Sequence, residues 1–111
     1  MTTYSLPHHK LRAYGAAVEL LRAVRGVKVR DAGLRDQALR SAKSACLNVA
    51  EGAGRVSRAD KARVFAIARA EAGEAAAAVE IAGMCGDASD VEAVLKAADA
   101  VVAMLTGLIR P

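Results

Sequence analysis

Small apolar residues repeat at helical spacing through the middle of this 111-residue chain, and this repeat limits the folds that the chain can adopt. Between residues 38 and 52 they recur at alternating steps of four and three. Such spacing places them on one side of a helix and is typical of a seam between packed helices. The seam consists of Ala38, Ala42, Ala45, Val49 and Gly52. Because these side chains are small, another helix must approach closely to bury them.

The rest of the chain agrees with a helical fold. Its apolar residues are mostly alanine, which is the strongest helix former and a poor strand former. Val, Ile and Thr never alternate with polar residues over the length of a strand. We therefore expect an all-α protein, and the length suits one domain spanning residues 1–111.

Breaks at glycines and polar residues divide the chain into four helices, predicted at about residues 9–25, 34–53, 58–85 and 89–110. The connections are short, which favours an antiparallel, up-down-up-down four-helix bundle. The predicted apolar face of the first helix is Leu11, Tyr14, Val18, Leu21 and Val24 or Arg25.

Local signals mark the ends of the last two helices. Ser57 with Asp60 forms a capping-box pattern at the start of the third helix, and Gly86 is its expected stop. Ser89 with Glu92 is a second capping-box pattern, which places the start of the fourth helix near Ser89, with Asp87 as an alternative cap.

Charge is unevenly distributed along the chain, although the net charge is only +4. Residues 1–69 contain fourteen Lys or Arg and five Asp or Glu, whereas residues 70–111 contain two and seven. The basic part suits an anionic partner such as RNA or DNA. It suits equally well a pairing with the acidic part, within one subunit or between subunits.

A cluster of cations surrounds the start of the third helix, where free backbone amides favour a phosphate group. The predicted phosphate-contacting residues are Arg40, Lys43, Arg55, Arg58, Lys61 and Arg63. Binding through them would be electrostatic and sensitive to salt, because three aromatic residues offer little for base stacking. The alternative interpretation is a solvated basic rim.

A polar stripe lies beside the alanine seam, and its residues step by four and three along the second helix. The stripe consists of Gln37, Ser41, Ser44, Asn48, Glu51 and Arg55. One interpretation is a hydrogen-bond network that fixes helix register or joins subunits. The other is a surface for a ligand or nucleic acid.

No residue pattern predicts catalysis, a metal or a cofactor. Both histidines, His8 and His9, precede the first helix, where we expect a frayed terminus. Cys46 and Cys85 are expected to be buried free thiols in a reducing cytoplasm. No signal peptide or membrane-spanning stretch is recognisable, so a cytoplasmic, non-enzymatic protein is expected.

Two carboxylates of the third helix, Glu71 and Glu74, stand one turn apart. We expect them to be ion-pair or hydrogen-bond partners of Arg40, Asn48 or Arg69 rather than metal ligands.

Residues 37–52 read Q-A-L-R-S-A-K-S-A-C-L-N-V-A-E-G. This run resembles the pattern Q-x-x-R-(A/S)-x-x-S-x-x-x-N-(I/V)-A-E-G of the four-helix bundle proteins encoded in intervening sequences of bacterial 23S ribosomal RNA genes. The resemblance spans about residues 11–110. Ala70 and Glu71 depart from it, since the family usually has Gly-Ser there, and the usual Phe-Pro between the first two helices is missing.

The resemblance implies an antiparallel bundle that assembles as a homopentamer. It also implies relatedness to accessory proteins of diversity-generating retroelements, which are basic pentamers that bind nucleic acid and a reverse transcriptase. The motif residues carried over are Gln37, Arg40, Ser44, Asn48, Glu51, Gly52, Arg55 and Glu74.

Two hypotheses of function follow. The first is a non-enzymatic, homo-oligomeric bundle that contacts RNA or DNA through its basic surface. The second is a scaffold that binds a protein partner, such as a reverse transcriptase, and has no role with nucleic acid.

Overall fold

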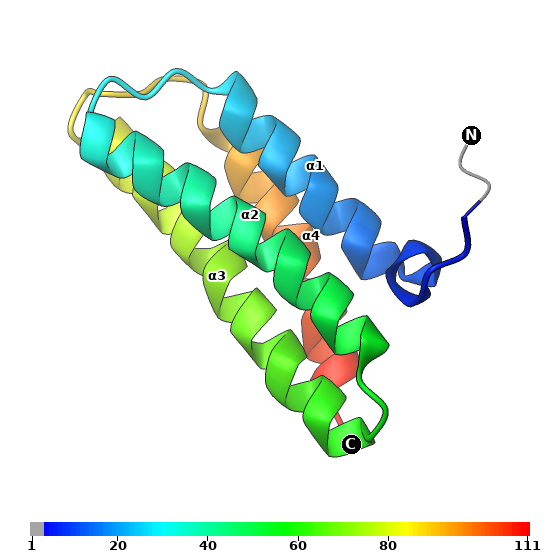
Figure 1. Ribbon diagram of the computed structural model, residues 1–111. Coiled ribbons are helices and arrows are strands. Elements are labelled where there is room, and N and C mark those ends of the chain that lie inside the picture. Colours follow the sequence, from blue (N-terminus) through cyan, green and yellow to red (C-terminus); the bar gives the residue numbers. More distant parts are fainter. Residues whose placement is uncertain (1–3) are drawn as a thin grey trace.

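The computed structural model describes residues 4–111, which form four helices (Figure 1). The helices are α1 (Arg12–Gly26), α2 (Ala32–Gly54), α3 (Arg58–Met84) and α4 (Glu92–Ile109), and the 3-10 turn η1 (Pro7–Lys10) precedes them. The all-α four-helix bundle predicted from the sequence is confirmed, and the helix ends differ from the predicted ones by at most three residues.

Consecutive helices run in opposite directions, and hydrogen bonds tie the connections together at the two ends (Figure 1). At one end, the backbone N–H of Arg30 donates to the carbonyl of Asp87 at 2.8 Å, and Val29 forms an antiparallel bridge with Ala88. At the other end, the Arg58 guanidinium donates to the carbonyl of Arg110 at 2.9 Å. Each helix therefore packs against two neighbours, with α1 between α2 and α4 and with α3 on the opposite side.

The alanine seam lies in the core, as the sequence predicts. All five residues are buried, four of them at most 1% exposed, and they pack in one core with buried small residues of α3. These α3 residues are Ala68, Ala72, Ala75 and Val79. Because both surfaces are made of small side chains, α2 and α3 share the most extensive contact in the bundle.

Gly52 ends the seam at its closest point. A Cβ atom placed on Gly52 would lie only 2.7 Å from Cδ1 and Cε1 of the Phe65 ring, which is itself buried. The absence of a side chain at Gly52 therefore lets the only phenylalanine of the protein lie against the α2 backbone.

The buried face of α1 is rotated from the predicted one. Its fully buried residues are Ala13, Ala17, Leu20 and Val24. Of the predicted face only Val24 is buried, while Leu11, Tyr14, Val18 and Leu21 are half-buried and Arg25 is exposed. Alanines lie at the centre of the buried face because α1 packs against two helices at once. The larger side chains cover the edges of the core.

The segment before α1 is ordered, so the expectation of a frayed terminus at His8 and His9 is wrong. Both histidines belong to η1, and the His8 ring packs edge-on against Tyr14 with 4.6 Å between ring centroids. The predicted first helix therefore begins three residues later than expected, and α1 starts at Arg12.

The predicted signals at both ends of α3 are confirmed. Ser57 Oγ accepts a hydrogen bond from the Asp60 amide at 3.1 Å. At the other end, Gly86 has a φ of +75°, and the amides of Gly86 and Asp87 bond back to the carbonyls of Gly83 and Ala82. This is the Schellman arrangement, which favours glycine at that position.

The predicted cap of α4 is wrong. The helix begins at Glu92, and its N-cap residue, Val91, makes no side-chain cap. Neither Asp87 nor Ser89 caps it, because residues 87 and 88 pair with the α1–α2 connection and hold this segment away from the helix. Asp90 then turns the chain with a φ of +56°.

A substitution at Gly52 tests the close contact of α2 and α3. Gly52→Ala should lower the free energy of unfolding by about 1–3 kcal/mol, because the new methyl group overpacks against Phe65. The control is Gly15→Ala on α1, where a Cβ meets nothing within 4 Å and the exposed position should gain roughly 0.5–1 kcal/mol. Urea denaturation measures both, and a Gly52→Ala variant as stable as Gly15→Ala would contradict the contact.

Candidate nucleic-acid interface

The predicted phosphate-binding residues separate into groups by the chemistry of their partners. Arg55 and Arg63 are ion-paired: Arg55 bonds Glu51 at 2.6 Å and Asp60 at 3.3 Å, and Arg63 bonds Asp60 at 3.0 Å. The hydrogen bond to Glu51, with the charges of both carboxylates, raises the pKa of Arg55. The carboxylates largely neutralise these two cations, so both are poor candidates for phosphate contact.

Arg58 and Lys61 bond only to carbonyl oxygens, which carry no formal charge. Arg58 donates to Arg110, and Lys61 Nζ donates to the carbonyls of Ala53 at 2.8 Å and Gly52 at 3.4 Å. These last two carbonyls end α2, where the helix dipole favours a cation. The bonds therefore hold Arg58 and Lys61 in place and leave their positive charge available.

Arg58 and Lys61 line a pocket at the end of the bundle together with Lys10 of η1. The pocket has a volume of about 520 Å³ and is bounded by η1 and by the ends of α2, α3 and α4. Its lining is Ser5, Pro7, Lys10, Leu11, Ala53, Arg58, Lys61, Phe65 and Leu108. Three cations line it and no carboxylate does. Arg12 lines an adjoining hollow beside Lys10 and Leu108.

We call Lys10, Arg12, Arg58 and Lys61 the basic end. Sequence analysis missed its first two members, because Lys10 is separated from Arg58 by the length of two helices. Only the topology of the bundle brings η1 beside the α2–α3 turn, and no local spacing indicates it.

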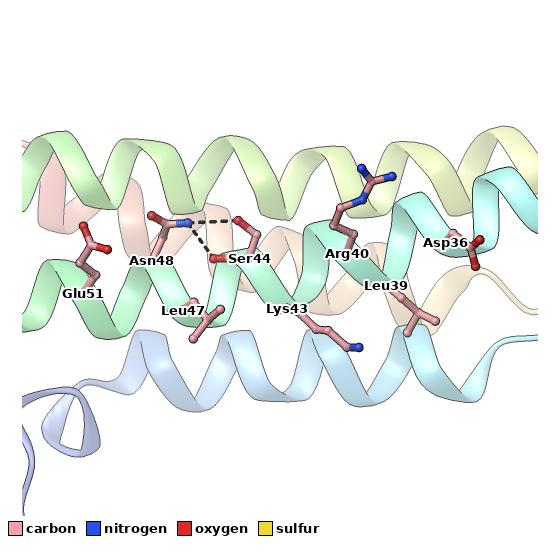
Figure 2. A pocket seen from close by; sticks show the side chains of 8 residues that line it. All are labelled: Asp36, Leu39, Arg40, Lys43, Ser44, Leu47, Asn48 and Glu51. Atoms are coloured by element: carbon pink, nitrogen blue, oxygen red, sulfur yellow. Dashed lines mark hydrogen bonds between the residues drawn. The ribbon is translucent and has the colours of Figure 1, made fainter.

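Arg40 and Lys43 lie apart from the basic end, on the outer face of α2 (Figure 2). Lys43 is ten residues before Ala53, which is about 15 Å along a helix. Arg40 leans toward α3 and donates to Gln37 at 3.3 Å, whereas Lys43 leans toward α1. Within residues 4–111, Lys43 makes no hydrogen bond or ion pair.

The polar stripe satisfies its hydrogen bonds mainly along α2. Gln37 donates to Ser41 at 2.9 Å, and Asn48 donates to the carbonyl and the hydroxyl of Ser44 at 2.9 and 3.1 Å. Ser41 is the only buried residue of the stripe. In the described chain, Arg55 is the only residue of the stripe whose side chain bonds to another helix, at Asp60 of α3. Within one subunit the stripe is therefore linked to α3 through Arg55, and its role in fixing helix register or joining subunits stays a prediction. A surface for a second subunit or a ligand stays a prediction.

The half-exposed part of the stripe borders a shallow hollow on α2 (Figure 2). Ser44, Asn48 and Arg40 line its α3 side, and Leu39, Lys43 and Leu47 line its α1 side. Leu47 is 71% exposed, so this face combines polar groups with an uncovered apolar side chain.

Glu74 of α3 lies near Arg40. The hydrogen bond and the negative charge of Glu71 raise the pKa of Glu74, while the charge of Arg40 acts in the opposite direction. Arg69 is not a partner of these carboxylates, because its Nε donates to Thr106 Oγ1 at 2.8 Å. The pKa of Glu74 is therefore raised on balance, because the charge of Arg40 offsets the effect of Glu71 only in part.

The two thiols differ from the expectation that both are buried. Cys46 is half-buried, and burial raises its pKa. Cys85 is exposed, because it follows the last turn of α3 and no helix packs over it. Both are free.

Two further properties bear on the class of protein. Within residues 4–111, no three His, Cys, Asp or Glu side chains lie close enough together to hold a metal ion. None of the described helices combines the length and the apolar character that crossing a membrane requires.

The fold and the basic end define a small helical-bundle protein with a cationic pocket at one end of the bundle. Residues 9–107 match the family model of the 23S rRNA-intervening sequence protein, and the chain belongs to this family. A comparison with curated proteins gave no match.

The contact of Glu74 with Glu71 predicts a dependence of stability on pH. A carboxyl group whose pKa is raised by folding binds its proton more tightly in the folded state, so its contribution to stability falls as the pH rises through that raised pKa. Glu74→Gln should therefore raise the urea midpoint relative to the parent protein near pH 7 and much less near about pH 4.

The matched control is Glu80→Gln, an exposed glutamate on the same helix. Its difference from the parent protein should stay constant over this pH range. A Glu74→Gln effect that is independent of pH would show that Glu71 and Glu74 do not interact.

Proposed function

We propose that this protein is a non-enzymatic, homo-oligomeric bundle that acts in the cytoplasm and associates with nucleic acid through its basic end. One observation carries the proposal: Arg58 and Lys61 are fixed by neutral carbonyl groups, so their charge is free to act on a phosphate. Lys10 and Arg12 add two cations that have no hydrogen-bond or ion-pair partner in the described chain.

The chemistry of this surface favours contact with the phosphate backbone rather than with base edges. Phosphate contacts supply affinity without sequence preference, and they weaken steeply with salt. Phe65 is 4% exposed and cannot offer its ring face to a base. Binding through the basic end should therefore be electrostatic and tolerant of sequence.

The outer face of α3 supports self-association. Its exposed apolar side chains are Ile67, Ile81 and Met84, and the surface around them carries exposed small residues as well as the charged Arg69, Glu74 and Glu80. These small residues are Ala66, Ala70, Gly73 and Ala77. Exposed apolar side chains on one face of a helix favour a covering partner, and small residues let a second helix approach closely. We propose a second copy of this chain as the cover, in the five-subunit assembly expected from the family resemblance.

Charge favours α2 of the next subunit as the surface that meets this face. Glu74 and Glu80 stand on the outer side of α3, whereas the exposed outer face of α2 carries Lys43 and Leu47. An interface of two different surfaces repeats from subunit to subunit and forms a ring if the rotation closes. The same apolar face also suits the alternative function, a scaffold for a protein partner such as a reverse transcriptase.

The salt dependence of binding tests the basic end. The variant Lys10→Gln/Arg58→Gln should weaken binding of a single-stranded RNA and reduce the slope of log K against log salt by about 1.4, because two phosphate contacts are lost. The control Arg25→Gln/Lys28→Gln removes the same charge at the opposite end of the bundle. Fluorescence anisotropy at several salt concentrations measures both. Equal losses in the two variants would assign binding to net charge alone.

Substitutions on α3 test self-association. Ile67→Glu/Ile81→Glu should convert the oligomer to monomers, because two charges then lie in the apolar interface. Val56→Glu is the control, since Val56 is 97% exposed in the α2–α3 turn and outside the proposed interface. Light scattering measures the mass, and circular dichroism checks that each variant remains helical. A parent protein that is monomeric at every concentration would overturn this part of the proposal.

A further inference from the structure

We infer that the pocket at the basic end binds a terminal phosphate group of a nucleic-acid strand, so that the protein prefers strand ends to strand interiors. The inference rests on the proposed function and narrows it from the phosphate backbone in general to one chemical group. Three features of the pocket carry it: its volume between four elements of the fold, its charge and the apolar residues of its lining.

Residues from four elements of the fold line the pocket. Pro7 and Lys10 belong to η1, Ala53 to α2, Arg58 to α3 and Leu108 to α4. Its volume of about 520 Å³ lies within the range of sites that bind small ligands.

The charge of the pocket matches a phosphate monoester better than a diester. A terminal monoester carries about −1.5 to −2 charges at pH 7 and three strong acceptor oxygens, whereas each internal diester carries one charge. The lining supplies three cations and no carboxylate to offset them.

Hydrogen-bond donors remain available on all three cations. The Arg58 guanidinium has five N–H donors, of which only Nη2 is engaged, by the Arg110 carbonyl. Lys10 is unengaged in the described chain. Lys61 is held by the carbonyls that end α2, so little side-chain freedom is lost when a phosphate binds there.

Part of the lining is apolar. It consists of Pro7, Leu11, Ala53, Phe65 and Leu108, of which Leu108 is 41% exposed. A lining that combines cations with apolar side chains suits the terminal nucleotide as a whole, with the phosphate on the cations and the sugar or base edge against Leu108. Inorganic phosphate alone would leave the apolar part unused.

The experiment compares one RNA sequence in four forms: with a 5′-phosphate, with a 3′-phosphate, with hydroxyl groups at both ends, and as a covalently closed circle. At least one phosphorylated form should bind about tenfold more tightly than the hydroxyl-ended and circular forms, which corresponds to one additional charge-assisted hydrogen bond. The 5′ and 3′ forms show which end the pocket takes.

Variants locate the effect in the pocket. Lys10→Gln, at an exposed position, should remove the preference for the phosphorylated form. Arg58→Gln should do the same, whereas Arg25→Gln at the opposite end should retain the full preference. A preference that persists in both pocket variants would overturn the inference.

The experiment distinguishes failure of the inferred preference for strand ends from failure of the proposed association with nucleic acid. If all four forms bind equally and binding falls with salt, the inference is wrong while the proposed association with nucleic acid stands. If no form binds even at low salt, both are wrong, and the scaffold becomes the leading function.

Discussion

Alanine side chains on α2 and α3 bring the two helices so close that a single Cβ atom at Gly52 would collide with Phe65. The short distance between α2 and α3 also determines the structure outside the core. It sets the last carbonyls of α2 beside the first turns of α3, and Lys61 spans that gap. The pocket wall at the basic end is thus a direct product of the alanine seam. A bulkier seam would separate the helices and move Lys61 away from its two acceptors.

The chemistry of each partner decides which cations remain useful for binding. Arg55 and Lys61 stand in the same turn region, yet Arg55 meets two carboxylates and Lys61 meets two carbonyls. A carboxylate both orients and neutralises an arginine, whereas a carbonyl only orients its donor. The basic end is therefore smaller than the count of cations suggests, but Arg58 and Lys61 are fixed in place, and they line one pocket together with Lys10.

Sequence reasoning was sufficient where the signal is local and insufficient where it depends on topology. The alanine seam, the Ser57 cap and Gly86 follow from spacing within one helix, and the structure confirms them. The face of α1 was misplaced because leucine and tyrosine outrank alanine in hydrophobicity, although close packing favours the smaller residue. Lys10 was missed because it reaches the site only through the bundle topology. The predicted cap at Ser89 is wrong because the α1–α2 connection pairs with the α3–α4 connection, which displaces the start of α4.

Self-association and the recognition of strand ends together constrain how the pockets are arranged in the assembly. If each subunit packs the apolar face of α3 against α2 of the next, the ring is cyclic, and cyclic symmetry places equivalent ends of all subunits on one side. The pockets beside Lys10 would then face the same direction. One strand has a single 5′ end, so several pockets cannot raise its affinity by engaging it together, as they would a continuous backbone. An oligomer of end-binding pockets would instead hold several strand ends at fixed separations, which distinguishes it from a basic ring that threads or wraps a strand.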